Sequence, residues 1–344
     1  NETDYSVNLL AAVFCVAGAD ADRAELAFYS GMANHFCWIE NDWRGSRGCE
    51  CFGCINETPF EEELRLLITM GLSAAYFIFG GAAQNANAEQ IKLEIMESID
   101  KGYPVLSRIS TQRHKQSIII GYENDGEKIV CKAAIEGSPS EGGAHKSAET
   151  FVHESWQDTI LDCIVLKERF ETVPERERVL EQLKLICGRA RKTDKFRGKI
   201  SSGFAAWESY LHMLEHEDLS ALPLTEAAPG GDSVQLRLGI YCDGLCQIWE
   251  RHAAHPFYRL LADKFPEWRG ELTAAASALD ECSKYGGFLW TQGFAFEGEG
   301  LEKFRSPAAR KILADEGRRA MQKDLEAVVM FEKILEKEGW LKNY

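Results

Sequence analysis

Three side chains in the first half of the chain could together carry out nucleophilic catalysis. His114 stands just before a β-branched run and could act as a general base, Ser6 opens an apolar segment and could act as a nucleophile, and Glu136 could orient the histidine. A cysteine nucleophile would need a place at a helix N-terminus, where the helix dipole lowers the pKa of the thiol. The helix expected over residues 6–16 has no cysteine in its first turns, since Cys15 comes about two and a half turns after Ser6. The lack of a cysteine at the start of this helix predicts that the chain does not use a cysteine nucleophile. The alternative interpretation of His114 is an exposed histidine in a polar loop.

A cluster of cysteines offers a second kind of chemistry, metal binding. Cys49, Cys51 and Cys54 lie close together, and His35 and Cys37 precede them. Thiolate and imidazole ligands in this number suit zinc, but the spacing differs from the usual pairs of C-x2-C knuckles. A redox-active pair and ordinary free thiols are the alternatives. We expect free thiols, no bound metal and no cofactor.

Aromatic and charged side chains at two places could line a ligand pocket. Trp38, Trp43 and Arg44 lie in a segment without a helical or strand pattern, where indole rings provide apolar area and charged groups orient a ligand. An interface between domains has the same composition and is the alternative. In the second half of the chain, Asp243 and Trp249 lie in a helical stretch and are candidates for the opposite wall of that pocket.

The pattern of apolar residues predicts an α+β domain over residues 1–170. The Asn124-Asp-Gly126 turn lies between two apolar runs and predicts a β-hairpin. Helices that precede a strand-rich half with hairpins favour an α+β fold over a doubly wound α/β sheet. Helices are expected over 6–16, 21–32, from 59 onward and over 87–101, and strands over 73–79, 103–108, 116–122, 127–133 and 159–167.

Residues 171–344 have the pattern of a second, all-α domain. Apolar residues recur at helical spacing, and the breaks between them contain proline and glycine. The charged stretch 302–337 is expected to form the solvated face of a long helix. Asp243 and Arg251 are eight residues apart and could share one helix face. Helices are expected over 173–189, 202–215, 232–254, 256–265, 267–289 and 306–337.

Composition and charge exclude several classes of protein. The chain has 344 residues, 45% of them hydrophobic, which suffices for a sizeable core and two domains. Its net charge of −15 argues against an extended surface for nucleic acid or anionic membranes. No apolar run approaches the roughly 18 residues of a membrane span, and the first residues lack a signal-peptide pattern. Cysteines that lie in helix-like runs indicate a reducing compartment, so we expect a cytoplasmic protein. From the net charge and the lack of a long apolar run, we expect neither nucleic acid nor a membrane as a partner.

Two motifs and the order of the elements around them resemble a known bacterial family. The motifs are Asp100-Lys-Gly-Tyr-Pro-Val and Ile-Ile-Gly121-Tyr, preceded by an apolar helix, a tryptophan-containing loop and a Pro-Phe-Glu helix. In these features residues 5–167 resemble the N-terminal domain of the butirosin-biosynthesis protein H acyltransferase. That domain is similar to the double-glycine-leader, papain-like cysteine peptidases. The second half is similar to the helical extension of such proteins, so the resemblance implies a papain-like domain followed by a helical domain.

The catalytic residues that this resemblance implies are mostly replaced in the chain. The nucleophilic cysteine would fall at about Tyr5 or Ser6, neither of which is a cysteine, and the histidine would fall near Lys115 or Gln116, so that His114 matches only with a local shift. The acidic or amide partner would fall near Ala134, with Glu136 as the closest substitute. The resemblance therefore implies that the fold is kept while the peptidase triad is lost.

The expected function is the binding of a small-molecule or acyl/peptidyl ligand by a catalytically degenerate papain-like protein, in a cleft between its two domains. One alternative is an acyl- or aminoacyltransferase of a biosynthetic pathway, which would position an acceptor amine against a carrier-bound acyl ligand. A second alternative is a non-catalytic structural or regulatory partner. A homodimer is left open.

Overall fold

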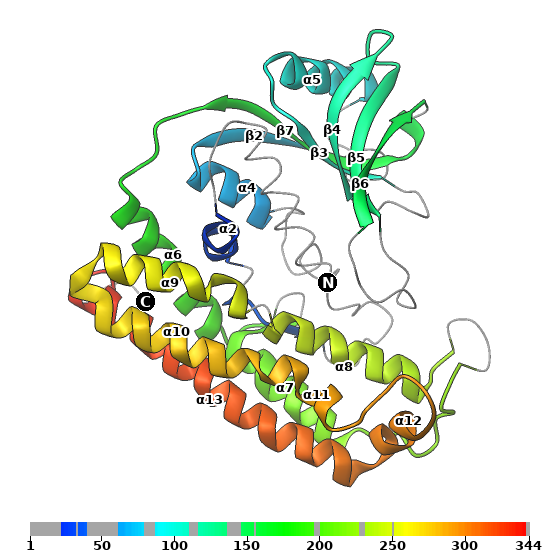
Figure 1. Ribbon diagram of the computed structural model, residues 1–344, viewed down its shortest axis with the longest axis vertical. Helices are drawn as coiled ribbons and strands as arrows, with labels where there is room; N and C mark the ends of the chain where they lie inside the picture. The colour runs from blue at the N-terminus through cyan, green and yellow to red at the C-terminus, as the bar shows by residue number, and fades with distance from the viewer. Residues whose placement is uncertain are drawn as a thin grey trace. The chain divides into compact units, whose positions relative to one another are not determined.

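The computed structural model describes residues 22–31, 34–39, 61–78, 87–109, 116–135, 146–154, 156–195, 200–226, 231–249 and 251–341. These residues combine α-helices with an antiparallel β-sheet and a helical C-terminal region, the α+β architecture that the sequence predicts (Figure 1). The chain forms two compact units. The first, called the sheet unit below, comprises 5–26 and 60–173, and the second, called the helical unit, comprises 1–4, 27–59 and 174–344. Helix α2 (Arg23–Ser30) contains the boundary between 26 and 27.

The sheet unit is built on six antiparallel strands. Strand β7 comes last in the chain but pairs with β2 on one side and β3 on the other. The expected strands are present, and β6 is a strand that the apolar pattern did not predict. Across the sheet the order is β2 (Leu72–Ile78), β7 (Ile160–Arg169), β3 (Val105–Ile109), β4 (Gln116–Glu123), β5 (Lys128–Ile135) and β6 (Lys146–His153).

The turn between β4 and β5 confirms the hairpin that the Asn-Asp-Gly sequence predicts. Asn124 and Asp125 have φ of 51°, and Gly126 has φ of 81°, a left-handed run that these residue types tolerate best. A Cβ on Gly126 would also lie 2.7 Å from Sδ of Met96. The indole of Trp156, in the short helix η4 (Trp156–Asp158), donates a hydrogen bond to the Gly126 carbonyl at 2.9 Å. The turn is thereby tied to the segment that leads into β7.

One face of the sheet packs against α5 (Ala88–Asp100). Asn87 caps this helix by accepting a hydrogen bond from the Gln90 amide at 2.8 Å, and Gly102, with φ of 82°, follows its end as expected. Ile91 and Ile95 of α5 are buried in a core cluster with residues from five strands. A further helix, α4 (Glu61–Thr69), contacts β2. The strand members of the cluster are Phe77, Val105, Ile119, Ile129, Cys131, Ile160, Cys163 and Val165.

The helical unit contains eight α-helices among its described residues after 174. The predicted helices are present with different bounds: α8 is described up to Trp249 and α9 from Arg251, and the helix expected over 267–289 is divided, because α11 begins after Lys284. Pro256 lies inside α9, where the His255 ring contacts the His252 carbonyl at 3.0 Å, an oxygen that Pro256 cannot bond because it has no N–H. The helices are α6 (Glu175–Arg191), α7 (Gly203–His216), α8 (Val234–Trp249), α9 (Arg251–Lys264), α10 (Arg269–Ser283), α11 (Tyr285–Thr291), α12 (Gly298–Arg305) and α13 (Pro307–Lys337).

Two short strands also belong to the helical unit. β1 (Cys37–Ile39) pairs with β8 (Ile200–Ser202) in antiparallel register, with Trp38 opposite Ser201. Gly203 ends this ribbon with φ of 57°, and a Cβ there would lie 2.3 Å from the Ala190 carbonyl oxygen. The sequence predicted a loop at Trp38, and that prediction was wrong. Three-residue strands carry no measurable periodicity, so only the pairing of Trp38 with Ser201, 163 positions away, reveals them.

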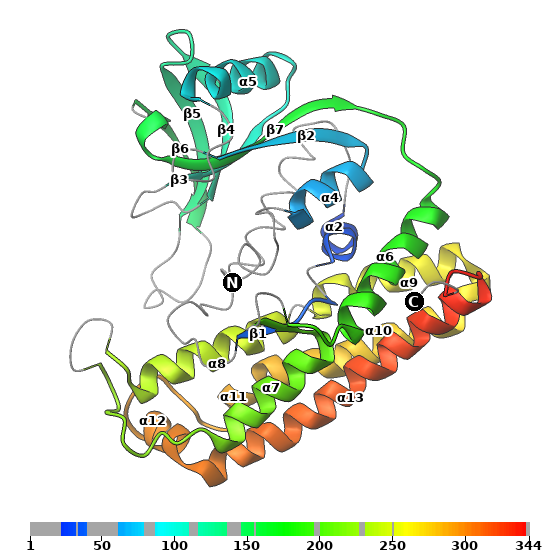
Figure 2. The same ribbon diagram turned by 180° about the vertical axis from the view of Figure 1, so that it is seen from behind.

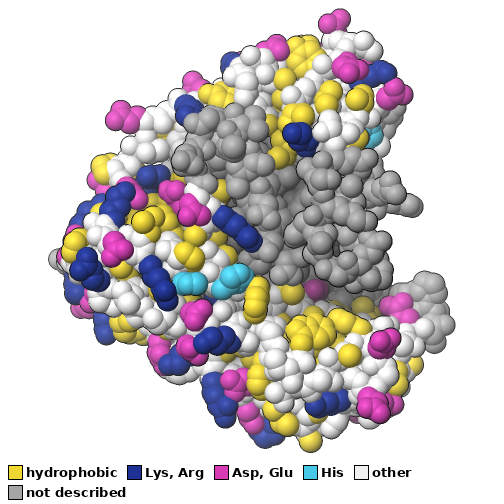
Figure 3. All heavy atoms as spheres, in the orientation of Figure 1, with side chains coloured by type: hydrophobic (Ala, Val, Ile, Leu, Met, Phe, Trp, Pro, Cys, Tyr) yellow, Lys and Arg dark blue, Asp and Glu magenta, His cyan; other side chains and the backbone are white. Residues whose placement is uncertain are grey.

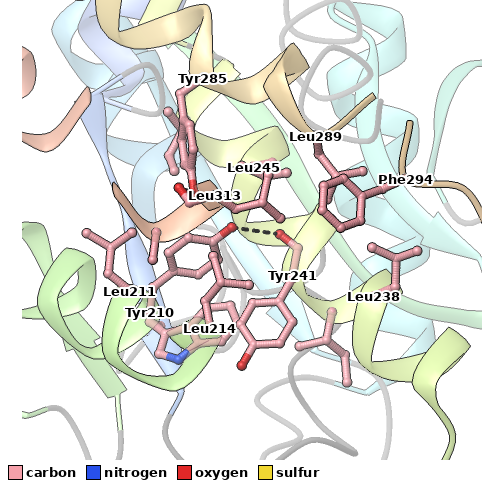
Figure 4. Close-up of a cluster of buried hydrophobic side chains, with 14 of the residues drawn as sticks. Tyr210, Leu211, Leu214, Leu238, Tyr241, Leu245, Tyr285, Leu289, Phe294 and Leu313 are labelled. Atoms are coloured by element: carbon pink, nitrogen blue, oxygen red, sulfur yellow. Dashed lines mark hydrogen bonds between the residues drawn. The ribbon is translucent and has the colours of Figure 1, made fainter. Parts of the chain in front are cut away.

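Helix α13 lies along the core of the helical unit, side by side with α10 and α7 (Figures 1 and 2). The charged stretch does form a long helix, as expected, and one face of it is buried. Gly317 permits the closest approach, because a Cβ there would lie 2.4 Å from Cδ2 of Leu211. Figure 4 shows the core cluster near this contact, in which the Tyr210 hydroxyl donates to the Tyr241 carbonyl at 3.4 Å.

A buried ion pair connects four helices of this unit. Arg251, at the start of α9, is 1% exposed and contacts Asp324 of α13 at 3.1 Å. The same guanidinium donates to the His35 carbonyl at 2.9 Å and to the Gln247 carbonyl at 3.2 Å. Asp324 also accepts a hydrogen bond from the Trp207 indole of α7 at 2.9 Å. Charged groups that leave water are stabilised only when they are paired and hydrogen-bonded in this way.

The charge distribution on the described surface is mixed. On the face drawn in Figure 3, Lys and Arg side chains alternate with Asp and Glu side chains, and the described residues form no extended basic area there. Within the described ranges, no helix combines the length and the apolar character that a membrane span requires.

The Arg251–Asp324 pair generates a prediction about stability. Replacing Arg251 by methionine leaves the Asp324 carboxylate buried without its cation, which should lower the free energy of unfolding by about 3–5 kcal/mol. Urea denaturation followed by circular dichroism measures this change. Adding Asp324→Asn to Arg251→Met should recover part of the loss, since the amide is neutral and its oxygen can still accept from Trp207.

The matched control is Lys284→Met in the same unit. Lys284 pairs with Glu281 at 2.5 Å, but its side chain is 61% exposed, so water screens the pair and little change is expected. If Arg251→Met were no more destabilising than Lys284→Met, the buried pair would have no special role in the stability of this unit.

Candidate functional site

Two of the candidate catalytic residues belong to chain segments that adjoin strands of the antiparallel sheet. At one end of the sheet β3 finishes, β4 begins and β5 finishes, with Arg108 opposite Gln116 and Ile118 opposite Lys132. The segments that follow β3 and β5 carry His114 and Glu136, which lie outside the described residues, as does Ser6. The described strands therefore supply the frame from which both segments leave.

A buried carboxylate lies at the same end of the sheet. Asp162 of β7 is 2% exposed and stands opposite Arg108 of β3 and Ile78 of β2 in the strand register. The Tyr76 hydroxyl donates a hydrogen bond to Oδ2 of Asp162 at 3.3 Å. Because Cys163 points into the core with α5, its neighbour Asp162 points to the opposite face. Asp162 was not a candidate in the sequence analysis, although a single acidic residue inside the apolar run 160–166 was a usable signal.

The core face of the sheet holds buried hydroxyls and buried thiols. The Ser107 and Ser117 hydroxyls on neighbouring strands are 2.9 Å apart and both buried. Burial raises the pKa of the Cys131 thiol to about 12, in spite of a hydrogen bond with Ser117. Burial also raises the pKa of Cys163. At neutral pH both thiols are protonated, so neither can supply the thiolate that a cysteine reaction needs.

In the helical unit, Trp38 is a core residue. Its indole is 4% exposed and its Nε1 donates to Sδ of Met213 at 3.1 Å. The ring packs edge-on against Tyr210, with centroids 4.9 Å apart, and stacks on Tyr241 at 5.5 Å. A Cβ on Gly244 would lie 3.3 Å from this indole, so the glycine lets α8 approach it. Trp43 and Arg44, the other candidates of this segment, lie outside the described residues.

Trp249 ends α8 at the surface, where 39% of it is exposed. Its backbone approaches α11 so closely that a Cβ on Gly286 would lie 2.7 Å from its Cβ. The His252 ring lies 5.0 Å from the indole, centroid to centroid. Asp243 is half-buried and precedes Trp249 by six residues, which places the two about 120° apart around the helix. The two candidates therefore do not share a face of α8.

The arginine that could have shared a face with Asp243 has a different partner. Arg251 is buried and bound to Asp324 of α13, as described above. Burial lowers the pKa of its guanidinium, but Asp324 together with the neighbouring Cys282 and Tyr258 raises the pKa by more, so the group remains charged. Arg251 thus has a structural role in the core.

The described part of the proposed metal cluster is a buried contact between a thiol and an imidazole. Sγ of Cys37 lies 3.0 Å from Nε2 of His35, and both residues are buried. Cys49, Cys51 and Cys54 lie outside the described residues. Among the residues that the structure does describe, no group of three or more His, Cys, Asp or Glu side chains is arranged to hold a metal ion.

A surface hollow of about 500 Å³ lies between α6 and α13. The Arg191 guanidinium donates to both carboxylate oxygens of Glu332, at 2.9 and 3.0 Å. Two of the charged residues that line the hollow are thus paired with each other. None of the candidate residues from the sequence lines this hollow, which is formed by Arg191, Val329, Glu332, Lys333, Glu336 and Leu341.

Two comparisons with known proteins found no match, so the functional assignment rests on the geometry of the structure. No family model matches the chain, and no curated protein matches it.

The buried thiols generate a prediction about reactivity. Cys131, Cys163, Cys187 and Cys282 are at most 1% exposed, and burial raises the pKa of each. Incubation of the native protein with iodoacetamide at pH 7, followed by peptide mass spectrometry, should leave these four unmodified until the protein is unfolded. The half-buried Cys246 serves as an internal reference that should react earlier. Rapid alkylation of Cys131 or Cys163 in the native protein would mean that the sheet contains an activated thiol.

Proposed function

We propose that the protein is a papain-like protein without a cysteine nucleophile, and that it binds a small-molecule or acyl/peptidyl ligand at the sheet end that carries His114 and Glu136. The antiparallel arrangement of β3, β4, β5 and β7, with a helix on one face, supports this assignment. The observation on which it mainly rests is the register between β4 and β5.

The register relates the two candidate residues to each other. Ile118 stands opposite Lys132 and Ile119 opposite Cys131 in the sheet. His114 precedes Ile118 by four residues along the chain, and Glu136 follows Lys132 by four residues. Opposed positions on antiparallel strands bring their side chains within contact distance. A carboxylate next to the histidine would orient the imidazole and stabilise its protonated form.

The chemistry available to such a pair depends on the nucleophile. With Ser6 at the position where the resemblance expects a cysteine, and with the described sheet thiols protonated, thioester or peptide cleavage through a thiolate is disfavoured. Ligand binding remains, with the imidazole and the carboxylate as its polar anchors. An acyl- or aminoacyltransferase is the second candidate, because an oriented imidazole could remove the proton from an acceptor amine that attacks a bound thioester.

A binding experiment with a defined probe tests the proposal. Octanoyl- and glycyl-N-acetylcysteamine thioesters represent carrier-bound acyl groups. Isothermal titration should detect binding of one of them to the wild-type protein and at least ~10-fold weaker binding to His114→Ala and Glu136→Gln, the loss of about one charge-assisted hydrogen bond. His255→Ala is the matched control, a histidine of the helical unit that should leave binding unchanged.

The same mixtures distinguish the alternatives. Under the proposal, free N-acetylcysteamine is not released from the bound thioester. Release that appears only when an amine acceptor is added, and that is lost in His114→Ala, would favour the transferase. Release without an acceptor that is abolished by prior alkylation would contradict the proposal, and a complete absence of binding would favour the structural or regulatory partner.

A further inference from the structure

Two exposed histidines lie one turn apart on α7. His212 and His216 are four residues apart, so both rings project from the same face of the helix. Their ring centroids are 4.6 Å apart, with 49° between the ring planes. The His216 side chain is 60% exposed, so an ion could reach the pair from solvent.

The ring separation matches what a metal chelate requires. Imidazole nitrogens bind Zn²⁺ and similar ions at about 2.0–2.1 Å, so the ion lies roughly 3.2 Å from each ring centroid. Angles of 90–109° at the metal then place the centroids about 4.5–5.2 Å apart. The observed 4.6 Å lies within this interval, and only small ring rotations are needed for both nitrogens to face one ion.

The helix that carries the pair is held firmly by its other face. Trp207, Tyr210, Leu211 and Leu214 of α7 are buried in the core cluster of the helical unit. Figure 2 shows α7 alongside α13, which it contacts over several turns. Ligands on a rigid element are already oriented before the ion binds, which reduces the entropy lost on binding.

The charges near the pair do not oppose a cation. Glu215 lies next to His216, with a carboxylate oxygen 4.0 Å from Nε2 of the ring. Arg318 and Lys311 both pair with Glu215, and both also pair with Asp315. The two cations and two anions balance, so the surface next to the histidines carries no excess positive charge.

The pattern His212-Met-Leu-Glu215-His216 also occurs in a class of zinc peptidases, where the glutamate is the general base. Here the Glu215 carboxylate is already paired with Lys311 and Arg318. Catalytic zinc sites also use three protein ligands, and the described residues form no such group of three. The arrangement is therefore suited to metal binding without hydrolysis.

We propose that His212 and His216 form a two-histidine chelate for a divalent transition-metal ion, with water in the remaining coordination positions. The site is independent of the proposed function at the sheet end. Neutral imidazoles favour Cu²⁺ over Ni²⁺ and Ni²⁺ over Co²⁺, and they bind Mg²⁺ and Ca²⁺ poorly.

Titration with Ni²⁺ tests this site. Accessible thiols are first blocked with iodoacetamide, so that cysteines do not contribute, and binding is measured by isothermal titration. The wild-type protein should bind one Ni²⁺ that the His212→Ala and His216→Ala variants each bind at least ~10-fold more weakly, since each loses one of two ligands. Both residues are exposed, and circular dichroism checks that the variants are folded.

A second histidine pair in the same unit provides the matched control. His252 and His255 of α9 are three residues apart, and each places its Nδ1 against the backbone carbonyl three residues before it, at 2.5 and 3.0 Å. The double variant His252→Ala/His255→Ala should bind Ni²⁺ as the wild type does. Equal Ni²⁺ affinity in wild type and His212→Ala, or loss of binding in the α9 variant instead, would overturn the proposal.

Thermal unfolding gives an independent measurement. An ion that binds only the folded state raises the melting temperature, so Ni²⁺ should raise it for the wild type and the α9 double variant but not for His216→Ala. Mg²⁺ at the same concentration should have no such effect. An equal rise in wild type and His216→Ala would place the ion elsewhere and contradict the assignment.

Discussion

The organisation of the helical unit depends on the burial of one ion pair. Moving a guanidinium and a carboxylate out of water costs several kcal/mol for each group, and their attraction offsets this cost only when the geometry is good. Arg251 and Asp324 meet that condition because α7, α8, α9 and α13 all contribute to it. A shift of α9 or α13 would leave a buried charge without its partner, and a shift of α7 or α8 would remove a hydrogen bond from the pair. The pair therefore restricts how the helices can pack, whereas apolar contacts alone would tolerate several arrangements.

This constraint extends to the segment around β1. Arg251 donates to the His35 carbonyl, and the side chain of Gln247 accepts the Cys37 amide hydrogen bond at 3.0 Å. The short strand is thus held by side chains of α8 and α9 as well as by its pairing with β8. Once this backbone is positioned, the Trp38 indole has to enter the core between Tyr210 and Tyr241. The position of the buried indole therefore depends on the buried ion pair.

Local chemistry explains which parts of the fold the sequence could predict. The hairpin at Asn124–Gly126, the end of α5 at Gly102 and the long helix after 306 follow from turn residues, caps and apolar spacing within a few positions. Features that depend on distant partners could not be predicted. Trp38 has the composition of a pocket residue, and only the ring contacts from α7 and α8 identify it as part of the core. In the same way, nothing near Arg251 in the sequence points to Asp324, which lies 73 positions away.

The two faces of the sheet carry different polar side chains, thiols on the core face and a carboxylate on the other, and this difference limits where a reaction could take place. Alternation along β7 places Cys163 in the core with α5 and Asp162 on the other face, where Tyr76 binds it. A thiol inside the core stays protonated, because burial penalises its charged form. A carboxylate on the other face is a hydrogen-bond acceptor that needs donors around it. A thiolate is therefore disfavoured on the core face of the sheet. The polar candidates from the sequence, His114 and Glu136, belong to segments that leave the strand ends, the first between β3 and β4 and the second after β5, and β4 lies between β3 and β5 in the sheet.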